Sequence, residues 1–278
     1  MLQKNVFPYY RACIKDMEDI YNDIKANFIN VEQSVRELVT MRGYVLGGEQ
    51  HQLLQEMQIC SCHIDTYEAW GNKGRELGLY GSSSVGEFLL NDRYIIPVRD
   101  IAGGLIALIG YFPDYKKYIT TPSPFFAKDT LFFNLDNAYP LSYKEFGGTV
   151  FVVEGIFDCL SLRAIGLPAI ATMGSDVSPV KKEILKIFRK VVYIPDSDRV
   201  GRRALNRYEK RGWNVPDTAT AIKLKGSVTF GSAENGETPV VKPIKDMDDL
   251  VSWFDADSVR EALLESAKSK ELVEVLQL

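Results

Sequence analysis

The chain has 278 residues, of which 46% are hydrophobic and 25% are charged, so it can bury a sizeable core and should form one large or two smaller domains. Its formal net charge of −4 argues against a nucleic-acid binder, unless acidic residues are concentrated at one site and basic residues elsewhere. The sequence shows no secretory signal and no long uncharged apolar stretch, which argues against secretion and membrane insertion.

The cysteines give no sign of a disulfide framework or of a zinc site. They are Cys13, Cys60, Cys62 and Cys159. This spacing has no disulfide rhythm and favours a reducing, cytoplasmic compartment. His63 follows Cys62, but a structural zinc site needs two separated ligand pairs, and His51 is the only other histidine. We therefore expect no zinc.

Residues 1–71 are predicted to be mainly helical. Val31, Val35, Leu38 and Val39 recur at helical spacing, and Gly43 is a plausible stop. No chemistry is visible in this part, so its predicted role is packing.

The periodicity changes over residues 77–135. The segment DRYIIPVRDIAGGLIALIGYF predicts two strands joined at residues 100–104, where glycines supply turn conformations. Pro122 and Pro124 then favour an extended loop. Gly147-Gly148 is the predicted boundary with the next domain.

Two short apolar runs that stop at carboxylates organise the rest of the chain. Val150–Val153 directly precedes Glu154, and Val191–Ile194 comes just before Asp196 and Asp198. Such runs, separated by helical segments, predict parallel strands buried on both faces, with chemistry at their carboxyl ends. Carboxylates packed at one edge raise one another's pKa unless a cation neutralises them. An all-oxygen cluster suits Mg²⁺ or Mn²⁺.

Further acidic residues are expected near the same edge. Gly155 would open a helix that places Asp158 about one turn on, and Lys245–Asp249 adds Asp246 and Asp248.

Two connecting segments also carry local signals. Ser178-Pro179 is predicted to begin a helix, with serine as N-cap and proline at the first helical position. The loop Met173–Ser175 either offers backbone N–H groups to a phosphate or is a tight turn without a ligand.

The last third of the chain contains three distinct stretches. Residues 199–212 predict a strongly basic helix that includes Arg199 and Arg202, and this helix either follows a nucleic-acid backbone or is only a solvated face. Residues 217–241 predict a hairpin or flexible insertion. Residues 256–278 predict an amphipathic helical tail that packs back on the domain or docks a partner.

Four segments together resemble the TOPRIM domain, in the form used by bacterial and phage DNA primases. They are VVEGIFDCLSL, IATMGS, YIPDSDRVGRRA and KDMDDLV. Ser197 departs from the family pattern, which usually has glycine between the two aspartates, and a small side chain should be tolerated there. The resemblance implies an α/β TOPRIM domain with a central, mostly parallel sheet flanked by helices, preceded by a mixed α+β subdomain. We predict a basic α+β subdomain on the template side over 1–147, the catalytic domain over 148–255 and the tail over 256–278.

The upstream segment resembles the primase polymerase core. Arg93 lies in a strand before Pro-x-x-Asp, Lys117 precedes Tyr118 and a proline loop, and Lys128 precedes an apolar strand. The resemblance implies that these cations hold template phosphates and the triphosphate of an incoming nucleotide. A solvated charged face is the alternative.

The resemblance implies a primase catalytic core, a DNA-directed RNA polymerase that synthesises short RNA primers in DNA replication. Its implied catalytic residues are Glu154, Asp196 and Asp198, and its implied ligands for Mg²⁺ or Mn²⁺ are Glu154, Asp158, Asp196, Asp198, Asp246 and Asp248. Its implied partners are single-stranded DNA, ribonucleoside triphosphates, a replicative helicase and a separate zinc-binding recognition protein, because the family's zinc module is not visible here. The expected location is the cytoplasm of a bacterial cell or phage-infected host.

Two other functions remain open on the sequence. A TOPRIM nuclease or topoisomerase-like enzyme uses similar acidic residues, although neither an ATPase domain nor a domain with a nucleophilic tyrosine is evident. A non-catalytic TOPRIM module could bind DNA or a replication partner, but an acidic cluster without a cation would be a costly set of like charges.

Overall fold

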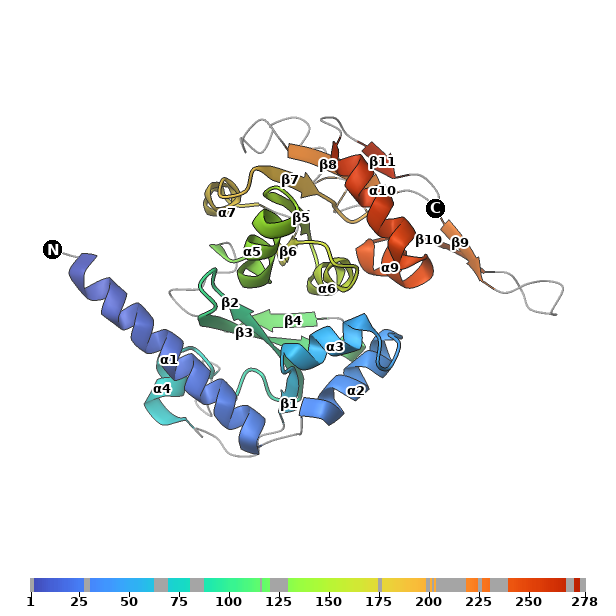
Figure 1. Ribbon diagram of the computed structural model, residues 1–278. Helices are drawn as coiled ribbons and strands as arrows, with labels where there is room; N and C mark the ends of the chain where they lie inside the picture. The colour runs from blue at the N-terminus through green and yellow to red at the C-terminus, as the bar shows by residue number, and fades with distance from the viewer. Residues whose placement is uncertain are drawn as a thin grey trace. The chain divides into compact units, whose positions relative to one another are not determined.

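The computed structural model divides the chain into two compact units, Met1–Leu131 and Phe132–Leu278 (Figure 1). It describes residues 3–27, 31–62, 70–80, 88–115, 117–120, 130–174, 177–198, 201, 203, 219–224, 227–230, 240–268 and 273–275. Within these residues, no helix has the length and apolar character needed to span a bilayer.

The first unit combines helices with one antiparallel sheet. Its elements are α1 (Gln3–Asn27), α2 (Val31–Arg42), α3 (Glu49–Glu56), β1 (Cys60–Cys62), α4 (Gly71–Glu76), β2 (Arg93–Arg99), β3 (Leu105–Phe112), the 3₁₀ turn η1 (Pro113–Tyr115) and β4 (Lys117–Thr120). The strands pair in the order β1-β2-β3-β4, and every neighbouring pair is antiparallel.

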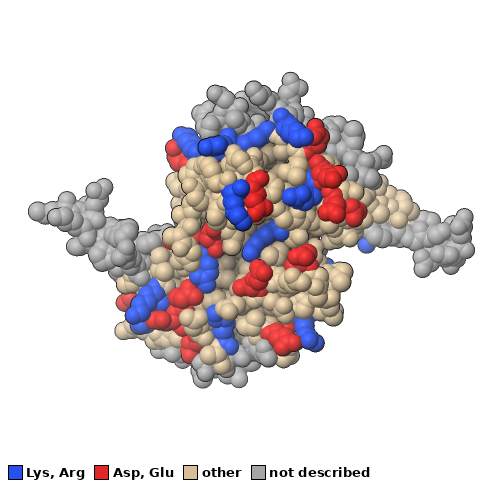
Figure 2. All heavy atoms as spheres, in the orientation of Figure 1, with Lys and Arg blue, Asp and Glu red and all other residues tan. Residues whose placement is uncertain are grey.

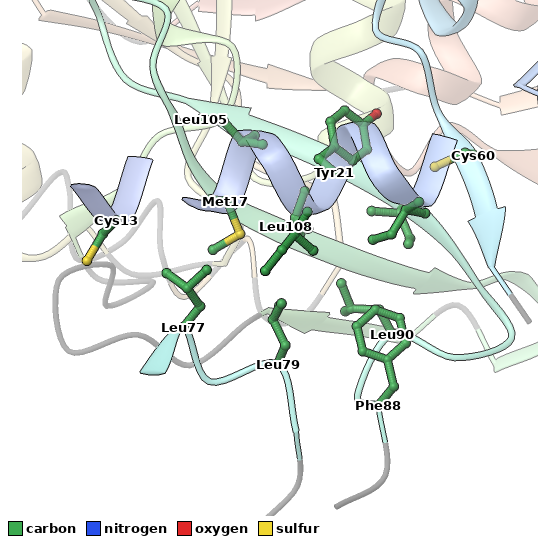
Figure 3. Close-up of a cluster of buried hydrophobic side chains, with 13 residues drawn as sticks. Cys13, Met17, Tyr21, Cys60, Leu77, Leu79, Phe88, Leu90, Leu105 and Leu108 are labelled. Atoms are coloured by element: carbon green, nitrogen blue, oxygen red, sulfur yellow. The ribbon is translucent and has the colours of Figure 1, made fainter. Parts of the chain in front are cut away.

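The core of this unit lies between α1 and one face of the sheet (Figure 3). Met17, Tyr21 and Ile24 recur at helical spacing on α1 and are fully buried. They pack against Leu105 and Leu108 of β3 and against residues that precede β2. Burial of this apolar stripe, rather than helix propensity alone, holds α1 on the sheet.

The helix α2 lies on the other face of the same sheet. Ser61 and Tyr94 alternate with core residues along their strands and therefore point to the opposite side. There the Ser61 backbone N–H donates to Ser34 Oγ, and Tyr94 Oη donates to Glu37 Oε2 at 3.2 Å. The sheet is thus fixed by helices on both faces.

The predicted strand pair is confirmed. β2 and β3 are joined by residues 100–104, where the Asp100 side chain accepts from the backbone N–H groups of Ala102 and Gly104. Gly103 adopts a φ of +85°, a conformation that favours glycine.

The second unit is built on a parallel sheet. Its elements are α5 (Leu135–Glu145), β5 (Thr149–Val153), α6 (Ile156–Ala164), β6 (Ala169–Ala171), α7 (Pro179–Leu185), β7 (Lys190–Tyr193), β8 (Ala219–Leu224), β9 (Ser227–Phe230), β10 (Val240–Pro243), α9 (Met247–Trp253), α10 (Ala256–Lys268) and β11 (Val273–Val275). The main sheet has the order β11-β8-β7-β5-β6 with all pairs parallel, and β9 and β10 form an antiparallel hairpin.

Helices cover this sheet because its strands are apolar on both faces. Val150 and Val152 of β5 belong to a core cluster with α5, Leu185 of α7 and Phe188. The helix α6 contacts β5, β6 and α9. The predicted α/β class is therefore confirmed. Along the chain, the first unit ends at Leu131 and the second begins at Phe132, upstream of the predicted Gly147-Gly148 boundary. The helix α5 belongs to the second unit because it packs on β5 and β6.

The final segment differs from the predicted helical tail. The helix α10 ends at Lys268, and β11 then joins the sheet edge beside β8. Of the two alternatives, the described part of the tail packs back on its own domain. Most of the predicted basic helix at 199–212 lies outside the described residues. Of the two alternatives for residues 217–241, the structure shows a hairpin, formed by β9 and β10, whereas residues 219–224 form β8 of the main sheet.

Candidate active site

The two strands that end at carboxylates are neighbours. β5 and β7 pair in parallel with Val152 opposite Tyr193, and the Ile194 backbone N–H donates to the Val152 carbonyl at 2.8 Å. Since the strands run in the same direction and end at the same level, Glu154 and Asp196 emerge at one edge of the sheet.

Asp196 is the electrostatic centre of this edge. Burial and, in decreasing order of effect, the negative charges of Asp158, Glu154, Asp246 and Asp198 together raise the pKa of Asp196 from 3.8 to about 8. We call these five side chains the carboxylate rim.

Glu154 is held by a neutral hydrogen-bond donor, and Asp158 is held by close packing against the backbone. Tyr193 Oη donates to Glu154 Oε1 at 3.3 Å, and Glu154 is only 9% exposed. Asp158 lies in the first turn of α6, which begins after Gly155. A Cβ on Gly155 would lie 2.3 Å from Asp158 Oδ2, so the absence of a side chain there lets the carboxylate lie against the backbone.

The helix α9 is tied to α6 through acidic side chains. Asp158 Oδ1 accepts from the Asp248 backbone N–H at 3.0 Å, and Ser161 Oγ donates to Asp248 Oδ1 at 2.5 Å. Asp246 is the N-cap of α9 and accepts from the Asp249 backbone N–H at 2.9 Å. The structure thus places Asp246 in the rim and directs the Asp248 carboxylate towards Ser161, a contact that the sequence does not reveal.

The loop after β7 is held by hydrogen bonds between its side chains and backbone groups. Ser197 Oγ donates to the Ile244 carbonyl at 2.7 Å, so the serine that departs from the family pattern links this loop to the segment before α9. Asp198 Oδ1 accepts from the Gly201 backbone N–H at 2.8 Å. A Cβ on Gly201 would lie only 2.0 Å from the Asp196 carbonyl oxygen, which makes glycine necessary for this close approach.

A buried lysine supports the neighbouring loop after β6. Lys181 is 2% exposed, and its Nζ donates to the Thr172 carbonyl directly before Met173, whose φ is +57°. Ser178 caps α7 as predicted, by accepting from the Lys181 backbone N–H. The only sequence signal for Lys181 is its position four residues before Leu185, on the inner face of α7.

The donor set of the rim fits a hard divalent cation in its chemistry, because every side chain offers carboxylate oxygen and none offers nitrogen or sulfur. Burial and the neighbouring carboxylates both raise the pKa of Asp196, so a bound cation would relieve the repulsion between these charges. As the described side chains are placed, no group of three acidic, histidine or cysteine residues is arranged to hold one ion. The charges are gathered, but ligand geometry would require the carboxylates to reorient.

The first unit carries two of the predicted cations near one end of its sheet. Arg93 begins β2 and Lys117 begins β4, whereas Lys128, Arg199 and Arg202 lie outside the described residues. The Arg93 guanidinium lies 5.5 Å from the centre of the Phe112 ring, and Phe112 stacks on Tyr115. Figure 2 shows basic side chains interspersed with acidic ones on the face that it draws, in keeping with the modest net charge.

Comparisons with known proteins agree with this architecture. Residues 151–216 match the family model described as Toprim-like. A DNA primase of Clostridium acetobutylicum is 32% identical over 121 residues, which cover 42% of this chain and 20% of that relative. The chain therefore spans about a fifth of the relative's length.

Solved structures extend the likeness over most of the chain. The RNA polymerase domain of Mycobacterium tuberculosis primase DnaG has a TM-score of 0.69 at 17% identity, covering 90% of this chain and 82% of that one. The DnaG primase catalytic domain bound to single-stranded DNA has a TM-score of 0.68 at 19% identity, covering 93% and 80%. The fold is that of a primase catalytic core.

Proposed function

We propose that this chain, which carries a TOPRIM-like domain and has the fold of a DNA primase catalytic core, is a nucleotidyltransferase that synthesises short RNA primers on single-stranded DNA during replication. The observation that carries the proposal is the carboxylate rim around Asp196 at the carboxyl edge of a parallel sheet. The similarity to a primase catalytic domain bound to single-stranded DNA supports the template assignment.

In this proposal Glu154, Asp196 and Asp198 hold the divalent cation, with Asp158 and Asp246 beside them. A bound Mg²⁺ or Mn²⁺ supplies positive charge that neutralises the rim and polarises phosphate oxygens. The sequence prediction also makes Asp248 a ligand, but its bond to Ser161 favours a positioning role, in which it fixes α9 and thereby Asp246.

The rim can also hold a proton. Because the pKa of Asp196 is raised to about 8, its carboxyl group stays protonated at neutral pH in the absence of a cation. This proton relieves repulsion within the rim, and its release would accompany the binding of positive charge.

The cations of the first unit would bind the nucleic acid and the nucleotide. Arg93 and Lys117 carry the charge that template phosphates and a ribonucleoside triphosphate require. Lys128, Arg199 and Arg202 are proposed for the same role on the resemblance alone. A replicative helicase and a zinc-binding recognition protein are the proposed macromolecular partners, in the cytoplasm of a bacterial cell or an infected host.

The test is template-dependent synthesis from labelled ribonucleotides on single-stranded DNA with Mg²⁺ or Mn²⁺. We expect short products from the unaltered chain and none from the Asp196→Ala, Asp198→Ala protein. Asp257→Ala, an exposed aspartate of α10, is the matched control and should synthesise normally.

Other outcomes point to the other functions. Metal-dependent cutting of the template without added nucleotides would replace the proposal with a nuclease or topoisomerase-like activity. DNA binding that survives loss of both aspartates, without any synthesis by the unaltered chain, would favour a non-catalytic replication accessory.

A further inference from the structure

A stacked column of side chains lies at the end of the first unit's sheet. The rings of Phe112 and Tyr115 are 5.1 Å apart and inclined by only 14°. The Arg93 guanidinium lies over Phe112, and Lys117 Nζ lies 5.8 Å from the centre of the Tyr115 ring. We call Arg93, Phe112 and Tyr115 the stacked column.

The local chain path builds this column. β3 ends at Phe112, the turn Pro113–Tyr115 reverses the chain, and β4 begins at Lys117, which pairs with Phe112 across the strands. Arg93 reaches Phe112 because Gly110 leaves room for it, since a Cβ on Gly110 would lie 2.6 Å from Arg93 Cδ. The turn therefore folds Tyr115 back onto the last ring of β3.

Packing within the described structure does not account for Tyr115. Its residue surface is 68% exposed although one ring face lies against Phe112, so much of the residue is in contact with water. An exposed aromatic ring at the end of a stack offers a flat, rigid surface at low entropic cost. The ring is therefore stacked without being buried.

An aromatic ring next to a cation favours single-stranded nucleic acid as the ligand, with a base on the ring and a phosphate near the cation. Every base has a π-face, and single-stranded nucleic-acid sites combine aromatic platforms with cations that follow the phosphates. Lys117 supplies such a cation, because its Nζ lies over the Tyr115 ring and its side chain is long enough to turn towards a phosphate. Asp114 is the only acidic residue between Tyr111 and Thr120, so one carboxylate opposes the lysines of this segment.

We infer that Tyr115 is a base-stacking residue for single-stranded nucleic acid. One base extends the stacked column on the outer face of the ring, while Lys117 lies near the backbone phosphate. The identity of the ligand rests on the proposed function, whereas the stacking platform rests on the ring geometry alone.

The experiment measures the dissociation constant of a fluorescent oligothymidylate for the full chain and its Tyr115 variants by anisotropy. Stacking of one base predicts that Tyr115→Ala weakens binding by roughly 5- to 150-fold. Tyr115→Phe and Tyr115→Trp should retain the affinity, and Tyr115→Leu should lose it, because leucine keeps apolar area but has no π-face. An oligomer with abasic sites should bind the unaltered chain and Tyr115→Ala equally.

Equal affinity of Tyr115→Ala and the unaltered chain would overturn the inference, as would full affinity in Tyr115→Leu, which would indicate an apolar contact. Primer synthesis by the unaltered chain together with unchanged binding by Tyr115→Ala would overturn only the stacking role. Stacking-dependent binding without any synthesis would instead overturn the proposed function and leave the stacking role in place. An unaltered chain that binds no oligomer would overturn the stacking role as well.

Discussion

The carboxylate rim and the stacked column represent opposite ways of presenting charge. The rim gathers five acidic groups, and burial raises the pKa of its central residue, Asp196. The column places Arg93 over the Phe112 ring, and Lys117, which is not part of the column, lies over its Tyr115 ring. Like charges in the rim oppose folding, whereas Arg93 and Lys117 lie in favourable contact with π-systems.

Stability and function conflict in the carboxylate rim but not in the stacked column. A neutral donor, Tyr193, holds the rim carboxylate of Glu154 in place without cancelling its charge. Among the described residues, the stacked column contains a single charged side chain, Arg93, which lies over an aromatic ring. We therefore expect substitutions in the two regions to affect folding and activity in different combinations.

The largest effect should follow neutralisation of the rim's centre. Asp196→Asn should lower primer synthesis by on the order of 10²- to 10³-fold, the range found when one preorganised electrostatic contact is removed. The same change should raise the free energy of unfolding of the metal-free protein by roughly 2–4 kcal/mol at pH 8, because ionisation of Asp196 stabilises the unfolded state of the unaltered chain and asparagine cannot ionise. Rate assays and denaturant unfolding in a chelator measure the two changes.

Asp257→Asn, on the exposed surface of α10, is the matched control and should change neither quantity. A less stable Asp196→Asn protein would contradict the view that the rim is destabilising.

A second large effect should come from the backbone beside the rim. In Gly201→Ala the new Cβ would meet the Asp196 carbonyl, which is backbone and cannot rotate away. A shift of about 1 Å in Asp196 should reduce synthesis roughly 10²-fold, and overpacking should lower stability by about 1–3 kcal/mol. Unlike neutralisation of Asp196, this change should therefore impair both properties.

Gly103→Ala in the β2–β3 turn is the comparison variant. It has open space for a Cβ but a φ of +85°, so it should lose about 1 kcal/mol of stability and keep its activity. Normal synthesis by Gly201→Ala would show that Asp196 need not be held at this position.

The placement of Glu154 and Asp196 at one edge could be predicted from the sequence, because parallel strands that lie side by side end at the same edge of the sheet. Apolar runs before Glu154 and Asp196 identify strand ends, and adjacent parallel strands bring their carboxyl ends together. Their catalytic and metal-binding roles remain predictions. The apolar spacing of α2 and the glycines of the β2–β3 turn are also local signals, and the structure contains both elements.

The other features could not be predicted because they depend on side-chain direction and distant contacts. Nothing local indicates that Asp248 bonds to Ser161, 87 residues away, or that Lys181 is buried against a loop carbonyl. Arg93 and Lys117 were identifiable only by resemblance, and the stacking of Tyr115 depends on the path of a three-residue turn. Tertiary geometry rather than residue type defines these contacts.

A smaller, graded effect should appear in the response of the rim to pH and metal. Because the pKa of Asp196 rises from 3.8 to about 8 on folding, the folded state retains a proton that the unfolded state releases, and stability falls as pH rises between these values. In a chelator, the Tm of Asp196→Asn should exceed that of the unaltered chain by more at pH 8 than at pH 5. Added Mg²⁺ should raise the Tm of the unaltered chain at pH 8 and narrow the gap. A gap that is the same at both pH values would contradict the burial of this charge.

The smallest expected effect distinguishes a phosphate contact from a stacking contact in the first unit. Lys117→Ala should weaken oligonucleotide binding and reduce the slope of log affinity against log salt by about 0.7, the value for one phosphate contact on a single strand. Tyr115→Ala should lower affinity with little change in slope, because stacking releases no counterion. Lys268→Ala, an exposed lysine of α10 paired with Glu265, should alter neither. If Lys117→Ala left the slope unchanged, the charge of Lys117 would serve the Tyr115 ring rather than a phosphate, and the cation beside the column would be part of the platform itself.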